Sequence, residues 1–221
     1  MTAATGRPRR RLALALALAA LGGCQILPRI SEPVQLYTLT PKTTFPATLP
    51  KVDWQLVVEV PTAPAGLNTS RIALSRTPFT LDYYANSAWT DNAPLMIQTL
   101  LVESFESTRC IVGVGREAIG LRPDFFLRTD LREFTADYDG TDPVPTVVVR
   151  INAKLIQMPE RRIVAFSTVE HRVKAAGSGF EAVLSAFDEA LGGVFKDIVT
   201  FTLVEGQKAW KTEAPGGTDA P

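Results

Sequence analysis

Residues whose types and spacing could support catalysis are scarce in this 221-residue chain. It contains one histidine, His171, so a histidine-dependent triad or zinc site would have to use that imidazole. The sequence has no G-x-S-x-G nucleophile elbow and no G-x-x-x-x-G-K-[ST] phosphate-binding loop. His171 falls near the end of an expected strand and is predicted to be a structural or surface histidine. This pattern disfavours a hydrolase, and we predict that the protein is not an enzyme.

Two short motifs superficially suggest ligand binding, but their spacing is wrong. The glycines of "VGVGREAIG" (residues 112–120) miss the G-x-G-x-x-G spacing of a dinucleotide-binding loop. The acidic run "DYDGTD" (residues 137–142) resembles a calcium loop, which would need a closing glutamate where Val148 stands. A hairpin turn explains this run better, so we predict no metal and no cofactor.

Cys24 is the residue with a clear chemical context. It ends "LGGC", a leucine, two small residues and a cysteine, directly after an apolar run from Leu12 to Leu21. Three arginines (residues 9–11) precede that run, and a basic segment before a short apolar one is typical of a signal peptide. A run of about ten residues is too short to span a bilayer. The motif resembles the lipobox of bacterial lipoproteins, which implies cleavage before Cys24 and acylation of its sulfur and new amino group. Several acyl chains on one residue anchor a protein stably to a membrane.

The composition after residue 23 is that of one folded domain. Removal of residues 1–23 takes away four arginines and no acids, so 23 cations against 23 anions become 19 against 23, a net charge of −4. No basic patch for nucleic acid is visible. The hydrophobic content of the whole chain, 46%, is ample for a packed core. With Cys24 acylated, Cys110 has no partner for an intramolecular disulfide and is expected to be a buried small apolar residue.

Composition divides the chain into four segments. Residues 1–23 are the predicted signal peptide, and residues 24–50, with five prolines, are predicted to form a lipid-anchored tether containing one short strand in "VQLYTL". Residues 51–205 carry the periodic apolar patterns of a folded domain. Residues 206–221 lack periodicity and are predicted to be disordered.

The domain combines strand and helix patterns. Alternating apolar residues predict strands that include 54–60, 111–115, 124–134, 146–157 and 162–173, the last two forming a hairpin. Apolar residues at helical spacing predict helices over 94–109 and 179–201. Two helices and about six strands joined by hairpins predict an α+β fold. We expect a two-layer domain in which one mostly antiparallel sheet carries both main helices on one face.

The stretch from Phe79 to Trp89 is rich in aromatic residues. Its rings could cover the first helix as part of the core. Alternatively, Tyr83, Tyr84 and Trp89 could form a partner-binding surface, because tyrosine and tryptophan are enriched at binding hot spots. Both interpretations stay open at this stage.

Five segments together resemble the ABC-type transport auxiliary lipoprotein family, which includes the paraquat-inducible protein C group. They are "YTL" (37–39), "VVEVPTAPAGLNTSRIAL" (57–74), "LDYYANSAWTDNAPLMIQTLLVESFE" (81–106), "LRTDLREFTADYDG" (127–140) and "AFDEALGGVFKDIVTFTL" (186–203). The resemblance covers essentially the whole chain after Cys24.

The resemblance implies a membrane-tethered, non-enzymatic accessory of a lipid-transport ABC system. The implied partners are an MCE-domain substrate-binding protein and its permease and ATPase. Members of the family can associate into rings, so a homo-oligomer is compatible with the resemblance. Gln25 after the lipidated cysteine, in place of aspartate, favours the outer membrane, with the domain facing the periplasm. A structural or assembly lipoprotein of the envelope, with no direct role in lipid traffic, is the alternative.

Overall fold

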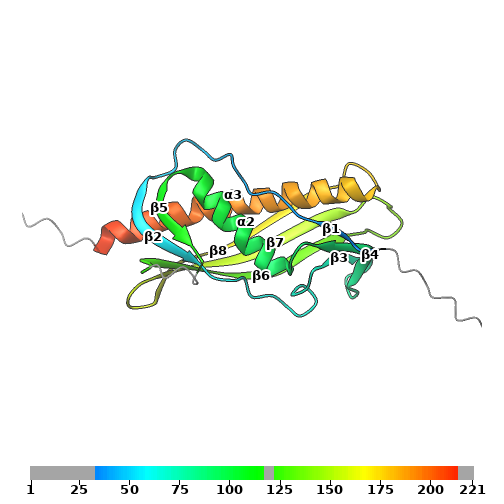
Figure 1. Ribbon diagram of the computed structural model, residues 1–221, viewed down its shortest axis with the longest axis horizontal. Coiled ribbons are helices and arrows are strands. Elements are labelled where there is room, and N and C mark those ends of the chain that lie inside the picture. The colour runs from blue at the N-terminus through cyan, green and yellow to red at the C-terminus, as the bar shows by residue number, and fades with distance from the viewer. Residues whose placement is uncertain (1–32, 117–121, 214–221) are drawn as a thin grey trace, which may run out of the picture. The chain divides into compact units, whose positions relative to one another are not determined.

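The computed structural model describes residues 33–116 and 122–213 (Figure 1). The predicted signal peptide and Cys24 lie outside the described residues. The chain divides into two units, Met1–Pro33 and Val34–Pro221, and only the second is described below. Its elements, in chain order, are β1 (Gln35–Tyr37), β2 (Val52–Val58), β3 (Arg71–Ser75), β4 (Asp82–Trp89), α2 (Ala93–Thr108), β5 (Ile111–Gly115), β6 (Phe125–Asp137), β7 (Thr146–Gln157), β8 (Arg162–Lys174) and α3 (Phe180–Glu213).

Strand β6 is the centre of an eight-stranded sheet. Along one edge it pairs over its whole length with β7, which in turn pairs with β8. Along its other edge it pairs with two strands at different heights. The start of β6 pairs with β2, which leads on to β5, and the end of β6 pairs with β3, which leads on to β4 and β1. Because β6 has thirteen residues, it is long enough to hold both groups.

The sheet is mixed, so the expectation of a mostly antiparallel sheet is wrong, whereas the α+β class is confirmed. Parallel pairs join β1 to β4, β2 to β5, β2 to β6 and β3 to β6. Antiparallel pairs join β3 to β4, β6 to β7 and β7 to β8. The antiparallel neighbours follow one another in the chain and are joined by connections of at most eight residues. Parallel neighbours need longer connections, which leave no local signal in a sequence.

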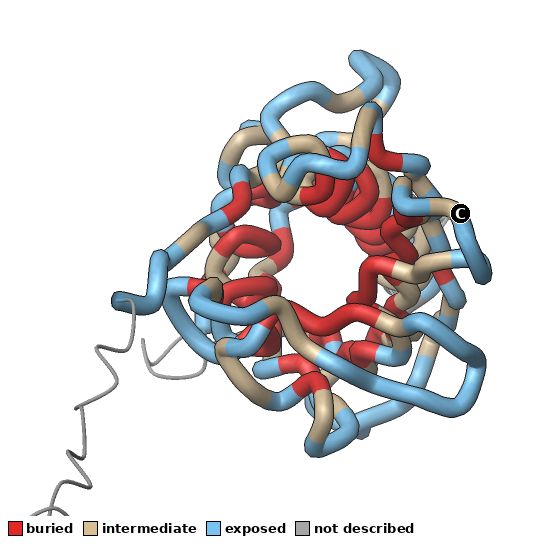
Figure 2. The backbone as a smooth tube through the Cα atoms, turned by 90° about the vertical axis from the view of Figure 1, so that its right-hand side faces the viewer, coloured by how far each residue is buried: buried red, intermediate tan, exposed pale blue. Residues whose placement is uncertain are grey.

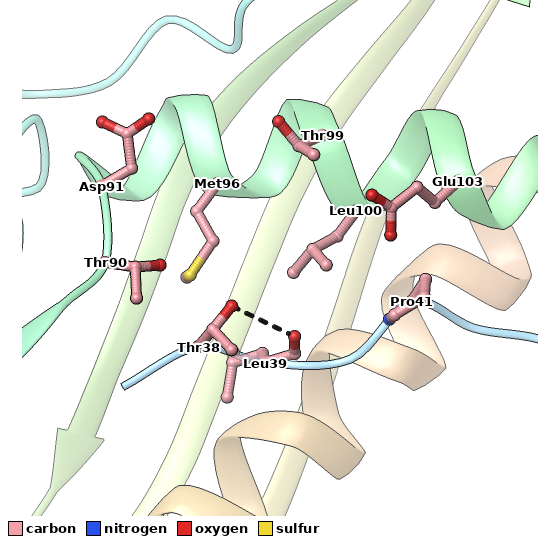
Figure 3. Close-up of a pocket in the computed structure, with 9 residues that line it drawn as sticks. All are labelled: Thr38, Leu39, Pro41, Thr90, Asp91, Met96, Thr99, Leu100 and Glu103. Carbon is pink, nitrogen blue, oxygen red and sulfur yellow. Dashed lines mark hydrogen bonds between the residues drawn. The ribbon is translucent and has the colours of Figure 1, made fainter. Parts of the chain in front are cut away.

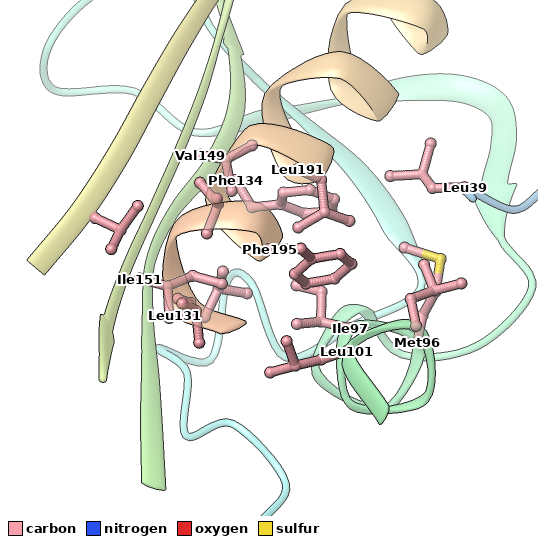
Figure 4. Close-up of a cluster of buried hydrophobic side chains, with 14 of the residues drawn as sticks. Leu39, Met96, Ile97, Leu101, Leu131, Phe134, Val149, Ile151, Leu191 and Phe195 are labelled. Carbon is pink, nitrogen blue, oxygen red and sulfur yellow. The ribbon is translucent and has the colours of Figure 1, made fainter. Parts of the chain in front are cut away.

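Both helices pack against one hydrophobic core. The inner face of β7 is an unbroken row of buried apolar residues that alternate along the strand. Figure 4 shows this row meeting side chains from α2 and α3 in a single cluster, which includes Ile97, Leu101, Leu131, Phe134, Val149, Ile151, Leu191 and Phe195. In the end-on view of Figure 2 the buried segments line the inner side of the sheet and helices, and the exposed segments lie outside.

Helix α3 extends to Glu213, well beyond the predicted end near Phe201. The tail predicted from residue 206 is therefore wrong for residues 206–213, and residues 214–221 lie outside the described residues. At 1.5 Å per residue the helix is about 51 Å long, whereas β8 spans about 43 Å. Its last turns therefore reach β2 and the start of β6. There the Nε1 of Trp54 donates a hydrogen bond to Gln207 at 3.3 Å, and the Trp210 ring lies 6.3 Å from that of Phe125.

The structure places Trp89 in the core, so its predicted role in a partner surface is wrong. Its side chain is 1% exposed. The ring lies 5.4 Å from both Phe134 of β6 and Phe187 of α3, as measured between ring centroids. Tyrosine and tryptophan are common in cores as well as at hot spots, and the composition of this stretch alone did not distinguish the two.

Substitution Gly206→Ala tests how closely α3 approaches the sheet. A Cβ at this position would lie 2.7 Å from Cζ2 of the buried Trp54. Alanine normally stabilises a helix interior by about 1 kcal/mol relative to glycine. Here overpacking, which costs about 1–3 kcal/mol, should dominate and lower the free energy of unfolding. Urea titration of the purified protein measures the difference.

Gly192→Ala is the matched control in the same helix. The atom nearest to its added Cβ would be Cδ of Lys42 at 3.8 Å, an ordinary contact. We expect this variant to be unchanged or stabilised by up to about 1 kcal/mol. Equal stabilisation by both substitutions would contradict the close contact between Gly206 and Trp54.

Substitution Trp89→Ala should lower the free energy of unfolding by about 3–5 kcal/mol, because it leaves a large cavity in the core. Trp89→Phe should cost much less, because the Nε1 of Trp89 has no hydrogen-bond partner among the described residues and its loss leaves no orphaned acceptor there. Phe79→Ala, at a side chain that is 96% exposed, serves as the neutral control. Thermal unfolding of the three variants would show the order, and a neutral Trp89→Ala would refute the buried placement.

Candidate functional site

The proline-rich segment before the domain is fastened across both helices. Residues 38–44, called the strap below, follow β1. The backbone N–H of Thr40 and its hydroxyl donate hydrogen bonds to the Asp188 carboxylate of α3, at 2.7 and 2.9 Å. The backbone N–H of Lys42 donates to Oγ of Ser104 in α2, at 2.9 Å. Leu39 is 5% exposed and joins the core. The predicted tether thus becomes part of the folded domain at its C-terminal end.

A groove of about 410 Å³ lies between the strap and α2 (Figure 3). It is lined by Thr38, Leu39, Pro41, Thr90, Asp91, Met96, Thr99, Leu100 and Glu103. The two charged side chains of this lining, Asp91 and Glu103, are both acidic. A phosphate group therefore finds no cation among the lining residues, and a catalytic nucleophile finds no histidine base. The chemistry of this groove suits packing against a neutral or basic surface.

Tyr83 and Tyr84, the two other residues predicted as a partner surface, are half-buried. The Tyr83 hydroxyl donates to the carbonyl of Gly66 at 3.0 Å, and the guanidinium of Arg71 lies 3.6 Å from the centre of its ring. The Tyr84 hydroxyl lies 2.8 Å from that of Tyr138. Burial, followed by this hydrogen bond, raises the pKa of Tyr84, so its hydroxyl stays neutral.

The Tyr84 ring also contacts α3. Its centroid lies 4.9 Å from that of Phe180, and the centroid of the Tyr37 ring lies 5.1 Å from the same phenylalanine. The aromatic stretch thus joins β1 and β4 to the start of α3. Tyr83 and Tyr84 remain partly exposed, but both also make contacts within the domain.

The connection between β3 and β4 presents the most exposed apolar side chain of the described residues. All residues of the segment 76–82, called the hairpin tip below, are exposed, and Phe79 is 96% exposed. The tip is held by its own hydrogen bonds. The backbone N–H of Thr80 donates to the carbonyl of Thr77 at 3.1 Å, and the Ser75 hydroxyl donates to the same carbonyl at 2.7 Å.

His171 lies on β8, as predicted, and faces α3. Its Nε2 lies 2.8 Å from Oδ2 of Asp197, and its ring packs so closely on Gly193 that a Cβ there would lie 2.4 Å from Nδ1. The histidine therefore joins strand to helix, which is a structural role. Cys110 is half-buried after α2, and its carbonyl accepts a hydrogen bond from the N–H of Val52.

The outer face of the sheet carries a ladder of charges across β6, β7 and β8. The guanidinium of Arg150 on β7 binds Glu133 of β6 at 2.7 Å and Glu170 of β8 at 2.6 Å. Arg172 also binds Glu170 at 2.6 Å. Hydrogen bonding to Arg172 lowers the pKa of the Glu170 carboxyl. The pairs satisfy one another and mark this face as solvated.

Within residues 33–116 and 122–213, no group of three or more histidine, cysteine, aspartate or glutamate side chains is arranged to hold a metal ion. In the same ranges, no helix is both long enough and apolar enough to cross a membrane. Cys24, the predicted acylation site, lies outside them.

The strap and the hairpin tip are the features that the sequence interpretation did not identify. The alternation in "VQLYTL" was a signal for β1, but nothing near Thr40 indicates that its partner is Asp188, 148 residues away. The tip could have been recognised from Pro78 and the exposed apolar residues beside it, because proline favours turns.

Comparison with known proteins gives the chain its family. Residues 37–199 match the family described as ABC-type transport auxiliary lipoprotein component. A crystal structure from Xanthomonas campestris, of a protein in the family DUF330, is 32% identical, covers 80% of this chain and 99% of its own, and superposes with a TM-score of 0.76. An uncharacterized protein of known crystal structure is 16% identical, over 76% of this chain and 97% of its own, with a TM-score of 0.61, a likeness of fold.

An uncharacterized protein of Bradyrhizobium diazoefficiens is 26% identical over 165 residues, 75% of this chain. This chain spans 43% of the length of that relative. The family match covers the strap, the aromatic stretch, α2, the central strands and the first twenty residues of α3, so it includes the groove and the hairpin tip. The chain therefore belongs to the family of ABC-type transport auxiliary lipoprotein components.

Proposed function

We propose that this protein is a non-enzymatic accessory lipoprotein of an MCE-type lipid transport system. Anchored through acylated Cys24, it would face the periplasm from the outer membrane and dock the envelope-spanning part of the transporter there. The observation that carries this proposal is the family match over residues 37–199, because the family is an auxiliary component of ABC-type transport. The lipobox-like "LGGC" supplies the anchor and Gln25 the choice of membrane.

The surfaces of the described residues support a role in docking to protein partners. The strap holds the chain that leads from the anchor against both helices through Asp188 and Ser104. A pull on the anchor would therefore be borne by the folded domain. The groove beside the strap is lined by acidic and hydroxyl groups and by no cation. Such a lining is not suited to bind an anionic lipid headgroup. Docking to protein partners, rather than carriage of lipid inside the domain, fits these surfaces, with Tyr83 and Tyr84 as candidate contacts.

Substitution Cys24→Ala tests the anchor. Because the acyl chains provide the membrane affinity, the variant should leave the outer-membrane fraction, either as free periplasmic protein or held by an uncleaved signal peptide. Fractionation of the envelope and intact mass of the protein measure the two effects. Cys110→Ser is the control, since that cysteine lies in the domain and should not alter the distribution. Normal outer-membrane fractionation of Cys24→Ala would refute lipid anchoring.

Affinity capture of the acylated protein from membranes tests the transport role. We expect an MCE-domain protein and its permease and ATPase to be recovered, together with phospholipid detected by mass spectrometry. The Cys24→Ala variant, expressed at the same level, should recover much less of these components because it is not held at the membrane. Recovery of envelope proteins without any of these components would instead favour the structural or assembly role.

A further inference from the structure

The hairpin tip and the N-terminal end of the domain lie at the same end of the sheet. Strand β1 runs parallel to β4, with Gln35 opposite Ser87 and Tyr37 opposite Trp89. Because the two strands run in the same direction, the chain enters β1 from the side on which β4 begins. That side is where the hairpin tip joins β4 at Asp82. Figure 1 shows β1, β3 and β4 together at one end of the sheet.

Covalent geometry limits how far this end can be from the acylated residue. Ten residue steps separate Cys24 from Val34, and even a fully extended chain of that length covers only about 35 Å. Gln35 pairs with Ser87, so Val34 lies level with Asn86 of β4, four residues after Asp82. Because β4 is bulged between Tyr83 and Ala88, the level of the hairpin tip is at most about 13 Å beyond Val34, well within that reach.

The tip is apolar where it is most exposed. Phe79 is 96% exposed and Leu81 is 42% exposed, and Val34, where the chain enters, is 58% exposed. One methyl group of Leu81 packs on Gly66, since a Cβ on that glycine would lie 2.5 Å from Cδ2 of Leu81. A group of exposed large apolar side chains at one end of a sheet is a candidate contact surface.

Charge does not dominate this surface. The tip carries one cation, Arg76, and one anion, Asp82. Arg76 lies over the Tyr138 ring at 5.3 Å, and the adjacent loop adds Asp139 and Asp142, the latter bound to Lys174 at 2.8 Å. A surface with no excess of basic residues is suited to the apolar boundary of a membrane, and its binding should not depend on anionic lipid.

We propose that the hairpin tip contacts the lipid surface in which Cys24 is anchored, with Phe79 and Leu81 inserted at the level of the headgroups. This inference rests on the proposed anchoring. The pre-formed turn at Thr77 and Thr80 presents Phe79 without further ordering, which lowers the entropic cost of insertion. The contact supplies a second attachment point beside the acyl chains and orients the domain on the membrane. The chain that joins Cys24 to β1 then leaves the bilayer at a defined position relative to the domain.

A fluorophore at residue 79 tests the contact in the acylated full-length protein. Phe79→Cys in a Cys110→Ser background allows labelling with an environment-sensitive dye after reconstitution into phosphatidylcholine vesicles. We expect a blue shift of emission and quenching by spin-labelled lipid, both unchanged by high salt. Quenching by the lipid distinguishes a membrane contact from burial against another protein or a second copy of the chain, either of which would shift emission without lipid quenching and would overturn the proposal.

Phe166→Cys in the same background is the matched control. Phe166 is also strongly exposed, at 76%. It lies five residues before His171 on β8, so the two side chains are on opposite faces of the sheet and Phe166 faces away from α3. Phe166 pairs with Lys154 of β7. Thr146, eight residues earlier on β7, pairs with Asp137, which pairs with Ser75 at the base of the hairpin tip. That separation is about 26 Å. The dye there should stay in water, and equal quenching at both positions would refute a contact specific to the tip.

Two further readouts separate the inference from the proposed function and from labelling artefacts. Flotation of the unlabelled protein with vesicles reports anchoring alone. A protein that does not float contradicts the proposed anchoring. If the protein floats but the dye at residue 79 of the labelled variant stays in water, only the tip contact is contradicted.

Hydrogen exchange of the unaltered protein gives an independent test. The backbone amides of residues 76–82 should exchange more slowly in the vesicle-bound protein than in the protein without vesicles. Unchanged exchange in that segment would count against the contact.

Discussion

Everything else in this fold depends on the burial of one sheet face under helix α3. The inward-facing residues of β7 from Val147 to Leu155 are apolar, those of β6 are mostly apolar, and α3 presents Phe187, Leu191 and Phe195 to them. A half-buried antiparallel sheet has a dry face and a wet face, and here the wet face carries the ladder built on Arg150. With that layer formed, α2 and the short strands around β6 have a surface on which to pack.

Completion of the core uses the N-terminal segment. Leu39 fills the space between the helices, while Thr40 and Lys42 bond to side chains of α3 and α2. The chain from β1 through the strap is therefore an integral part of the folded domain.

Local patterns were enough to predict the helices and the β7–β8 hairpin, because amphipathic spacing and short turns act between near neighbours in the chain. They failed where the relevant contact was distant. The last turns of α3 have little apolar periodicity, yet they are helical because Gly206 fits against Trp54 and Trp210 against Phe125. Likewise, the sheet is mixed because four pairs of strands are parallel. The two strands of each such pair are far apart in the chain, so no tight turn between them marks the pairing.

The sequence by itself determined the family, the α+β class and the positions of most elements, since each is written in residue types and spacings that act locally. It also predicted Cys24 as the anchor from a contiguous motif. Only the tertiary structure decided which aromatic residues are accessible. Trp89 is enclosed between β6 and α3, whereas Phe79, ten residues earlier, stands in solvent at the hairpin tip. Burial depends on what folds over a residue, and for Trp89 those covering groups come from segments far away in the chain.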